Sequence, residues 1–234
     1  ICSERRMYSM LTGRNTLSLQ IFASLFIVFG VCLMSLTLFV HNAITVADEN
    51  SLARQERFAA RNLEAAEAII PQEQRSATVW DDAIENTIAR DQDWMNENLG
   101  VWMQGYFGHH ENYILDQANE PFFASVLGEL RSPEVYANRA EFITPVVAEL
   151  RDIMAEVAVV KSLQLGDKVA IVSVVPIISD SGEIVQELGT EAVHVAVRYY
   201  DAELALEIGQ PIELSGVAFE EQKPSKDLAG IPVT

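Results

Sequence analysis

The residues best suited to ligand chemistry in this chain are a tryptophan and the two aspartates that follow it, Trp80, Asp81 and Asp82. An indole face beside a carboxylate suits a cationic or hydroxylated small molecule, because the ring attracts cations and the carboxylate accepts hydrogen bonds. The same residues also fit a structural role, with Trp80 in the core and both acids near a helix N-terminus, where the dipole favours negative charge. Both interpretations stay open.

Five further residues are candidates for the same ligand-binding site. Four of them would complete the pocket: Trp94, Asn98, Tyr106 and Tyr113. Aromatic residues at helical spacing more often lie in a core. The fifth, Arg198, shares one face of an alternating segment with His194, and a guanidinium binds a ligand carboxylate through paired hydrogen bonds. We expect that face to be solvated, with Arg198 paired to one of the chain's many acids.

Metal and catalytic chemistry have little support in the sequence. His109, His110 and Glu111 are consecutive, so their side chains point apart, and they do not supply four tetrahedral ligands. We find no nucleophile elbow, His-Glu-x-x-His helix, phosphate-binding loop or glycine-rich dinucleotide motif. The sequence therefore predicts no metal, no cofactor and no catalytic activity.

The charge of the chain is −18 at pH 7 and is unevenly distributed. Residues 1–40 hold three arginines against one glutamate, whereas the remainder holds 13 basic and 33 acidic residues. So acidic a region repels nucleic acid, and we exclude nucleic-acid binding. Both cysteines, Cys2 and Cys32, precede this region. We therefore expect a packed domain without disulfides.

Residues 17–40 form an apolar stretch without any charged residue. As a helix they would extend about 36 Å, enough for a hydrocarbon core of about 30 Å. A cleaved signal is the alternative, but its apolar part is usually shorter. Because arginines precede the stretch and acids follow it, we place residues 1–16 in the cytoplasm and the rest, from about residue 41, outside.

Residues 41–75 are predicted to form a long helix that continues out of the membrane and ends at Pro71. Its apolar residues recur along one seam: Leu52, Ala59, Leu63, Ala66 and Ile70. Such a seam suits either pairing with a second copy of the chain or packing on its own domain. We slightly favour pairing, and hence a homodimer.

Two further helices are predicted, at about 76–90 and 92–104. The buried stripe of the first comprises Trp80, Ala83, Ile84, Thr87 and Ile88. The stripe of the second comprises Met95, Leu99 and Trp102.

Strands and two more helices follow from about residue 111. Period-two and apolar runs predict strands at 112–115, 122–126, 169–178 and 191–200, and around 217–219. Helices are predicted at 133–155 and 201–208, the former with a stripe of Val135, Phe142, Val146, Leu150 and Ile153. This order predicts an α+β fold, in which residues 76–234 form a PAS-like (Cache-like) antiparallel sheet flanked by helices.

The chain resembles the CHASE family, type four, over residues 45–234. Its matching segments are Thr78-Val-Trp-Asp-Asp-Ala83, Asp93-Trp-Met-Asn-Glu-Asn-Leu99, Ile114-Leu-Asp116 and Val195-Ala-Val-Arg-Tyr-Tyr-Asp-Ala-Glu-Leu204. The turn after Asp116 lacks the glycine that the family usually carries. The resemblance also implies a final strand and a second membrane helix beyond Thr234, which we expect to be missing here.

The resemblance implies a receptor of the bacterial inner membrane whose periplasmic domain senses a small ligand or another cue. The cytoplasmic output would be a diguanylate cyclase, a cyclic-di-GMP phosphodiesterase or a histidine kinase. A membrane-anchored module that binds a periplasmic protein is the alternative, and it predicts an exposed apolar patch instead of an enclosed pocket.

Overall fold

The computed structural model describes residues 4–153, 157–210 and 218–219. The chain divides into two units, Ile1–Arg57 and Phe58–Thr234. A long helix, α1, runs from Glu4 to Thr78 and contributes to both units, so each unit is described by itself.

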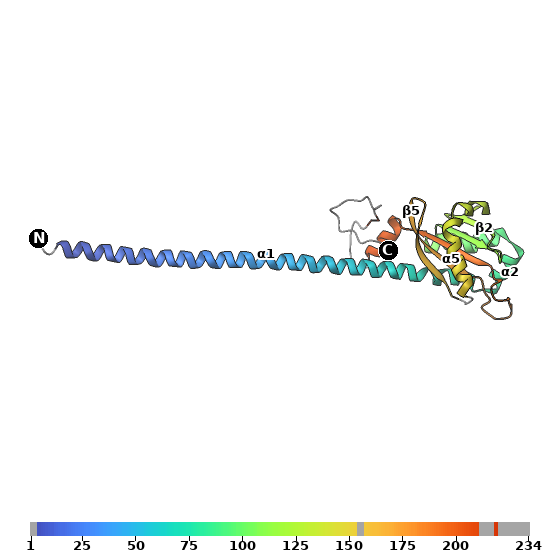
Figure 1. Cartoon of the computed structure of the whole chain (residues 1–234), viewed down its shortest axis with the longest axis horizontal. Helices are drawn as coiled ribbons and strands as arrows, with labels where there is room; N and C mark the ends of the chain where they lie inside the picture. The colour runs from blue at the N-terminus through green and yellow to red at the C-terminus, as the bar shows by residue number, and fades with distance from the viewer. Residues whose placement is uncertain (1–3, 154–156, 211–217, 220–234) are drawn as a thin grey trace. The chain divides into compact units, whose positions relative to one another are not determined.

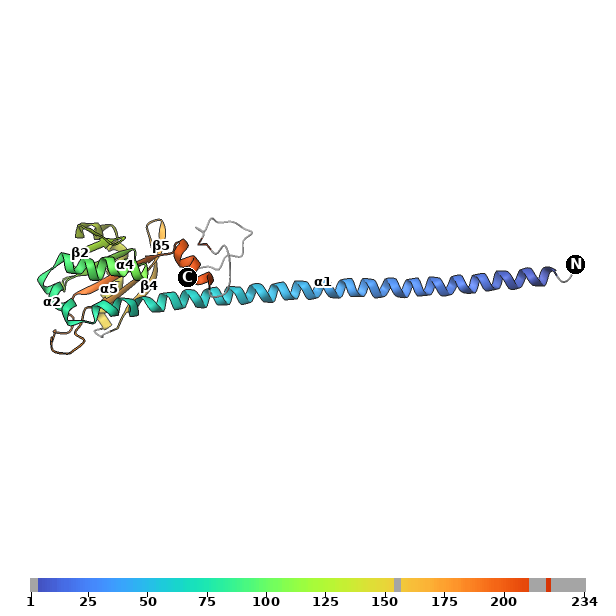
Figure 2. The same ribbon diagram turned by 180° about the vertical axis from the view of Figure 1, so that it is seen from behind.

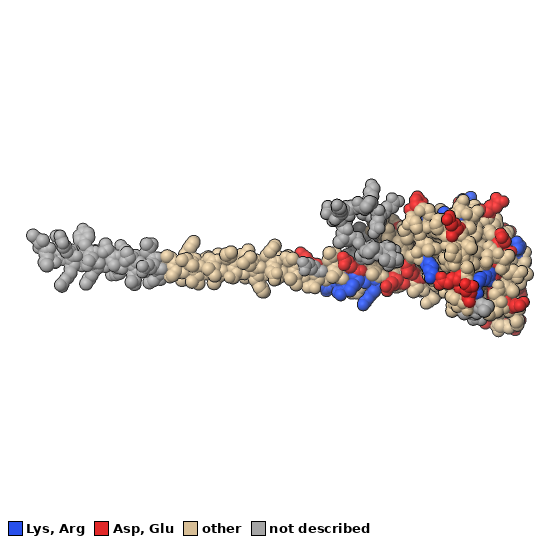
Figure 3. Space-filling model, in the orientation of Figure 1, with Lys and Arg blue, Asp and Glu red and all other residues tan. Residues whose placement is uncertain are grey.

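In the first unit, residues 22–47 carry no lysine, arginine, aspartate or glutamate, and they form the uncharged stretch of α1 in Figure 3. Within the described residues, α1 is the one helix long and apolar enough to cross a membrane, with a mean hydropathy of 2.5 in its most apolar 18-residue window. The described side chains of this stretch are exposed, so it is not the core helix of a folded domain. The predicted apolar N-terminal helix is confirmed.

In the second unit, α1 continues through Pro71 to Thr78, so the prediction that Pro71 ends the helix is wrong. A proline inside a helix removes one backbone hydrogen bond. Burial of Gln74 and Ala77, both beyond the proline, holds the last two turns in place. The next helix, α2 (Asp81–Ala89), consequently begins later than predicted. Of the residues predicted to form its buried stripe, Ala83, Ile84 and Thr87 are buried. Ile88 is 74% exposed, so the prediction is wrong for this residue.

Three short helical segments replace the single helix predicted at 92–104: α3 (Gln92–Met95), the π-helical turn η1 (Asn96–Val101) and α4 (Trp102–Phe107). The side chain of Asp91 begins α3 by accepting hydrogen bonds from the backbone N–H groups of Asp93 and Trp94. The wider π turn shifts the helical phase by one residue. Met103 is therefore buried beside Met95 and Leu99, and the predicted Trp102 is exposed.

Six antiparallel strands form one sheet in the order β3-β2-β1-β6-β5-β4. They are β1 (Glu111–Leu115), β2 (Pro121–Val126), β3 (Glu129–Arg131), β4 (Val159–Leu165), β5 (Lys168–Pro176) and β6 (Val193–Tyr199). The α+β class and four predicted strands are confirmed, whereas β3 and β4 were not predicted. Of the strand predicted around 217–219, residue 217 lies outside the described residues, and 218–219 have no regular structure.

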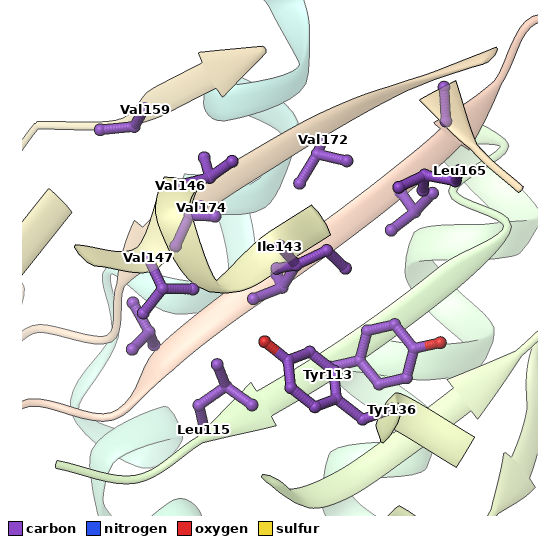
Figure 4. Close-up of a cluster of buried hydrophobic side chains, with 14 of the residues drawn as sticks. Tyr113, Leu115, Tyr136, Ile143, Val146, Val147, Val159, Leu165, Val172 and Val174 are labelled. Atoms are coloured by element: carbon purple, nitrogen blue, oxygen red, sulfur yellow. The ribbon is translucent and has the colours of Figure 1, made fainter. Parts of the chain in front are cut away.

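One face of the sheet, hereafter the α5 face, is covered by the 3-10 turn η2 (Pro133–Asn138) and helix α5 (Ala140–Ile153). Figure 4 shows their residues packed over Tyr113, Leu115 and Val174. The predicted stripe is wrong in part, since Phe142 and Ile153 are exposed and Ile143 and Val147 are buried. The tighter turn η2 precedes α5 and has fewer residues per turn. Counting an α-helical period from Val135 therefore does not predict which residues of α5 are buried.

The opposite face, hereafter the α1 face, is covered by the last turns of α1, by η1 and α4, and by α6 (Ala202–Gly209). Helix α5 lies in front of the sheet in Figure 1, and α4 lies in front in the view from behind in Figure 2. Ala66 and Ile70 of the seam pack here against Ile171, Ala196 and Leu204, with Ala59 and Leu63 beside them. These seam residues therefore serve the domain's own core, which is the alternative we favoured less.

Strand β6 is buried on both faces, so the prediction that one face is solvated is wrong. His194 and Ala196 are fully buried, and Arg198 is 5% exposed. The period-two pattern of β6 assigned residues to two faces correctly, but it did not show that helices cover both.

Candidate functional site at the start of α2

The predicted site residues Trp80 and Asp81 lie where the chain leaves α1 and enters α2. Val79 forms an isolated parallel bridge with Ile178. The N–H of Ile178 donates to the carbonyl of Thr78 at 3.0 Å, and the N–H of Trp80 donates to the carbonyl of Ile178, also at 3.0 Å. These bonds draw Trp80 into an extended conformation, at φ −166° and ψ 134°, so that α2 starts at Asp81.

The carboxylate of Asp81 organises the loop that follows β5. It accepts hydrogen bonds from the hydroxyls of Ser179 and Ser181. Those hydroxyls in turn accept bonds from the N–H groups of Gly182, at 2.8 Å, and Glu183, at 3.0 Å. The bonds from Ser179 and Ser181 hold the pKa of Asp81 below its usual value. Asp81 therefore links the start of α2 to this loop, and it stays ionised to stronger acidity than an ordinary aspartate.

Trp80 and Trp94 form an aromatic pair beside Asp81. Their ring centroids lie 5.6 Å apart with a 46° angle between the planes. Trp94 packs against the core cluster around Met95 and Ile177, whereas Trp80 is 36% exposed. Asn98 donates to the carbonyl of Trp94 at 2.9 Å. The indole of Trp80 is thus partly exposed next to acidic side chains. An aromatic wall that binds a cationic or hydroxylated molecule needs such a surface.

Three predicted residues lie away from this pair. Tyr113 is buried on the α5 face and donates its hydroxyl to Glu111 at 2.7 Å. Tyr106 stacks on Trp102, with centroids 4.0 Å apart, and is 71% exposed. Arg198 pairs with Glu207. The predicted residues therefore do not form one pocket: the structure joins Trp80, Asp81, Trp94 and Asn98, leaves Asp82 exposed beside them, and separates the rest.

Sequence reasoning missed the loop residues Ser179 and Ser181 as partners of Asp81. The segment Ser179–Gly182 was recognisable only as a tight turn. Nearly a hundred positions separate it from Asp81, and the parallel bridge at Ile178 is what brings the two together.

The three consecutive residues of the rejected metal motif have separate partners. The ring of His109 contacts the Glu73 carboxylate at 2.9 Å, and the ring of His110 contacts that of Asp201, also at 2.9 Å. Glu111 bonds to Arg139 on the α5 face. In the described part of the chain, no three His, Cys, Asp or Glu side chains lie close enough together to hold a metal ion.

A further buried histidine, His194, lies under α1. The amide nitrogen of Gln74 lies 3.0 Å from its Nδ1 and 3.2 Å from the backbone carbonyls of Ser173 and His194. Burial, and secondly the neighbouring His109, lowers the pKa of His194 to about 3, against a small opposing effect of the Leu99 backbone. The imidazole is therefore neutral at physiological pH.

Comparison with known proteins identifies the family. The model of the CHASE4 domain matches residues 62–217, about two thirds of the chain, and the chain therefore belongs to the CHASE4 family. These are extracellular sensory domains of signalling receptors, and they are not catalytic. The match covers Trp80, Trp94, the Ser179–Gly182 turn and all six strands. No curated protein matches the chain.

Proposed function

We propose that this chain is the ligand-sensing, extracytoplasmic part of a transmembrane receptor, and that its site at the start of α2 reads a small cationic or hydroxylated solute. The signal passes along α1, through the membrane, to a cytoplasmic cyclase, cyclic-di-GMP phosphodiesterase or histidine kinase. In this proposal the sheet is PAS-like, the receptor is a homodimer in a bacterial inner membrane, and the domain lies in the periplasm.

The observation that carries the proposal is the direct connection between the site and α1. Ile178 bonds to Thr78, the last residue of α1, and also to Trp80, while the neighbouring Ser179 bonds to Asp81. A ligand that displaces this loop would therefore act on the last turn of α1 through backbone hydrogen bonds. Because α1 is one helix from Glu4 to Thr78, it supports transmission toward the apolar segment. Such a ligand shifts the receptor only if it binds one arrangement better than the other.

A thermal unfolding experiment on the full chain in lipid nanodiscs tests ligand sensing. Choline, putrescine and glucose serve as probes of the cationic and hydroxylated classes. A ligand at a hundred times its Kd stabilises the folded state by about 2.7 kcal/mol. We expect at least one probe to raise Tm in the wild type and not in Trp80→Ala. Ile88→Ala, which removes an exposed side chain of the same helix, is the matched control and should keep the shift.

Two outcomes would refute the site. One is that none of the three probes changes Tm; the other is that Trp80→Ala keeps the full shift.

A labelling experiment tests the proposed orientation. Glu183 is exposed, so Glu183→Cys in a Cys2→Ser, Cys32→Ser background gives a single reactive thiol. We expect a membrane-impermeant maleimide to label it in intact cells whose outer barrier is permeabilised. Labelling only after lysis would place the domain in the cytoplasm and end the receptor proposal.

One observation favours the alternative, a protein-interaction module. Four apolar side chains are exposed around η1, α4 and the β2–β3 turn: Val101, Trp102, Tyr106 and Leu127. Trp102 and Tyr106 stack on each other, and the backbone of Val101 lies against Gly128. Exposed aromatic groups of this kind are typical of protein contacts. Loss of a co-purifying periplasmic protein on Tyr106→Ser, with unchanged Tm, would favour this alternative.

A further inference from the structure

A row of small and polar side chains crosses the α1 face of the sheet. The strand register aligns Ser125 of β2 with Asn112 of β1, Asn112 with Ala196 of β6, and Ala196 with Ser173 of β5. All four residues are fully buried. A buried sheet face is ordinarily filled by large apolar side chains. The neighbouring row holds Phe123, Ile114 and Val175, with His194 between the last two.

The elements that cover this row also present polar groups to the interior. Eight buried side-chain atoms have no hydrogen-bond partner within the described part of the chain: Gln74 Oε1, Thr78 Oγ1, Asn96 Oδ1, His109 Nδ1, Asn112 Oδ1, Ser125 Oγ, Ser173 Oγ and His194 Nε2. All belong to the α1 face or to the helices and the loop that cover it. We call these eight residues the polar layer. The Leu99 backbone lies near the His194 imidazole and favours its protonated form.

Two observations place members of the layer close together. Gln74 reaches both His194 and the Ser173 carbonyl, which joins α1 to β5 and β6. At Gly100 in η1, an added Cβ would lie 2.7 Å from Ser125 Oγ and 2.9 Å from Asn96 Oδ1. The π turn therefore rests directly on the polar row. Single π turns within helices are frequent at functional sites.

The hydrogen-bonding chemistry of the layer is mixed, and His109 differs from the other members because its ring also contacts the Glu73 carboxylate. The amide nitrogen of Gln74 faces two backbone carbonyls, so it is the donor, and a hydrogen bond between it and His194 Nδ1 requires Nδ1 to accept. His194 Nε2 then carries the proton and is a donor. The amide oxygens of Gln74, Asn96 and Asn112 accept, and the hydroxyls of Thr78, Ser125 and Ser173 do both. Neither an anion nor a cation fits this set better than a neutral molecule.

Energetics require that these atoms have partners. A buried polar group without a hydrogen bond loses free energy comparable to a whole hydrogen bond, and eight of them together would offset the entire stability of a typical domain. Native structures satisfy the great majority of such groups, with protein or with bound molecules.

We propose that the polar layer is a binding site for small uncharged molecules that both donate and accept hydrogen bonds, held between the sheet, η1 and the last turns of α1. Two sources supply this chemistry: ordered water, and an uncharged solute such as a diol or an amide. The inference stands apart from the site at Trp80 and does not depend on it.

Replacing single hydroxyls tests the site on the full chain in nanodiscs. If Ser173 and Thr78 bond to bound molecules, Ser173→Ala and Thr78→Val remove those bonds, and each should lower Tm by about 2–4 °C. If the hydroxyls have no partners, removing them should raise Tm. Ser76→Ala, which removes an exposed hydroxyl two residues before Thr78, is the matched control and should leave Tm unchanged. An unchanged or higher Tm in both variants would overturn the proposal.

A second measurement separates the two sources. Water oxygen-17 relaxation dispersion detects long-lived internal water, and a dispersion that decreases in Ser173→Ala supports the site with water as its occupant. Ethylene glycol and acetamide serve as solute probes. A larger rise in Tm for the wild type than for Ser173→Ala supports a solute. The site would be refuted if no internal-water dispersion were seen and if both probes changed the Tm of the wild type and of Ser173→Ala equally. This outcome does not depend on the result for Trp80→Ala.

Discussion

The two faces of the sheet bury polar groups in opposite ways. On the α5 face, the ion pair between Glu111 and Arg139 lies beside an apolar cluster, and every oxygen of the carboxylate has a partner. Arg139 donates two bonds, of 3.1 and 2.9 Å, and the hydroxyls of Tyr199 and Tyr113 donate at 2.5 and 2.7 Å. On the α1 face, the polar layer leaves eight atoms without protein partners among the described residues.

We infer from this difference that the α5 face fixes one arrangement of the fold, whereas the α1 face is suited to a change in helix position. Burial alone would raise the pKa of Glu111, but the bonds from Arg139, Tyr199 and Tyr113 outweigh it and hold this pKa below its usual value. Such a saturated network fixes one arrangement. The α1 face instead contacts the helix that leads to the apolar segment, and its bonds to small molecules can be re-formed if that helix shifts.

The largest expected effect is the loss of the partner of Glu111. In Arg139→Met, a buried carboxylate loses its cation, and we expect the free energy of unfolding to fall by about 3–5 kcal/mol. Arg131→Met breaks an exposed pair with Glu129 and should cost about 0–1 kcal/mol. Chemical denaturation of both variants measures the difference. Equal effects would remove the contrast between a saturated buried network and the surface.

The next largest effect is a pH dependence that comes from the α1 face. His194 has a pKa of about 3 in the folded chain and about 6.5 when unfolded, so the unfolded state binds more protons between these values. Stability is therefore full above pH 6.5 and falls as the pH decreases toward 3, with a loss of about 2 kcal/mol by pH 5.

His194→Gln tests this source of the pH dependence. It should remove most of the slope between pH 7.5 and 5, as measured by denaturation, because the carboxylate of Glu111 titrates only at lower pH. The pair of His109 and Glu73 is another titratable pair near His194, and Glu73→Gln is the control. An undiminished slope in His194→Gln would contradict the assignment.

An effect of similar size is expected where η1 packs on the polar row. An added methyl in Gly100→Ala meets Ser125 Oγ and Cβ and Asn96 Oδ1 within 3 Å, and it should destabilise the domain by about 1–3 kcal/mol. Gly105→Ala is the control: it meets nothing within 4 Å, so its higher helix propensity should stabilise by up to about 1 kcal/mol. If the double variant Gly100→Ala, Ser125→Gly regains the stability that Gly100→Ala loses, the added methyl clashes with the Ser125 side chain. Unchanged stability in Gly100→Ala would contradict the prediction.

The smallest effect concerns the loop beside Trp80. Asp81→Ala removes the acceptor for Ser179 and Ser181, which in turn position the amides of Gly182 and Glu183. Faster hydrogen exchange should appear at those two amides without a change in the unfolding midpoint. The neighbouring Asp82→Ala serves as the control and should leave both amides as in the wild type, because Asp82 is exposed. Uniform exchange rates across the three proteins would show that Asp81 does not order the loop.

Local patterns predicted the elements well where one physical cause dominated. The uncharged run in residues 17–40, the alternation of β6 and the apolar run of β5 each arise from a single requirement for burial in lipid or in a sheet. The phases of the helices were less predictable. The π turn at Asn96–Val101 and the 3-10 turn at Pro133–Asn138 each rotate the helix that comes next in the chain, and neither turn has a reliable local signal.

By itself, the sequence determined the apolar N-terminal helix, the α+β class and the family, because helix and strand periodicity and short family motifs are properties of neighbouring residues. Only the tertiary structure decided that Gln74 meets His194, that Asp81 meets Ser179, and that helices cover both faces of β6. Those contacts depend on the strand order β3-β2-β1-β6-β5-β4, which results from the packing of the whole domain and from no local segment. The same packing turned an apparently solvated strand face into a buried polar layer.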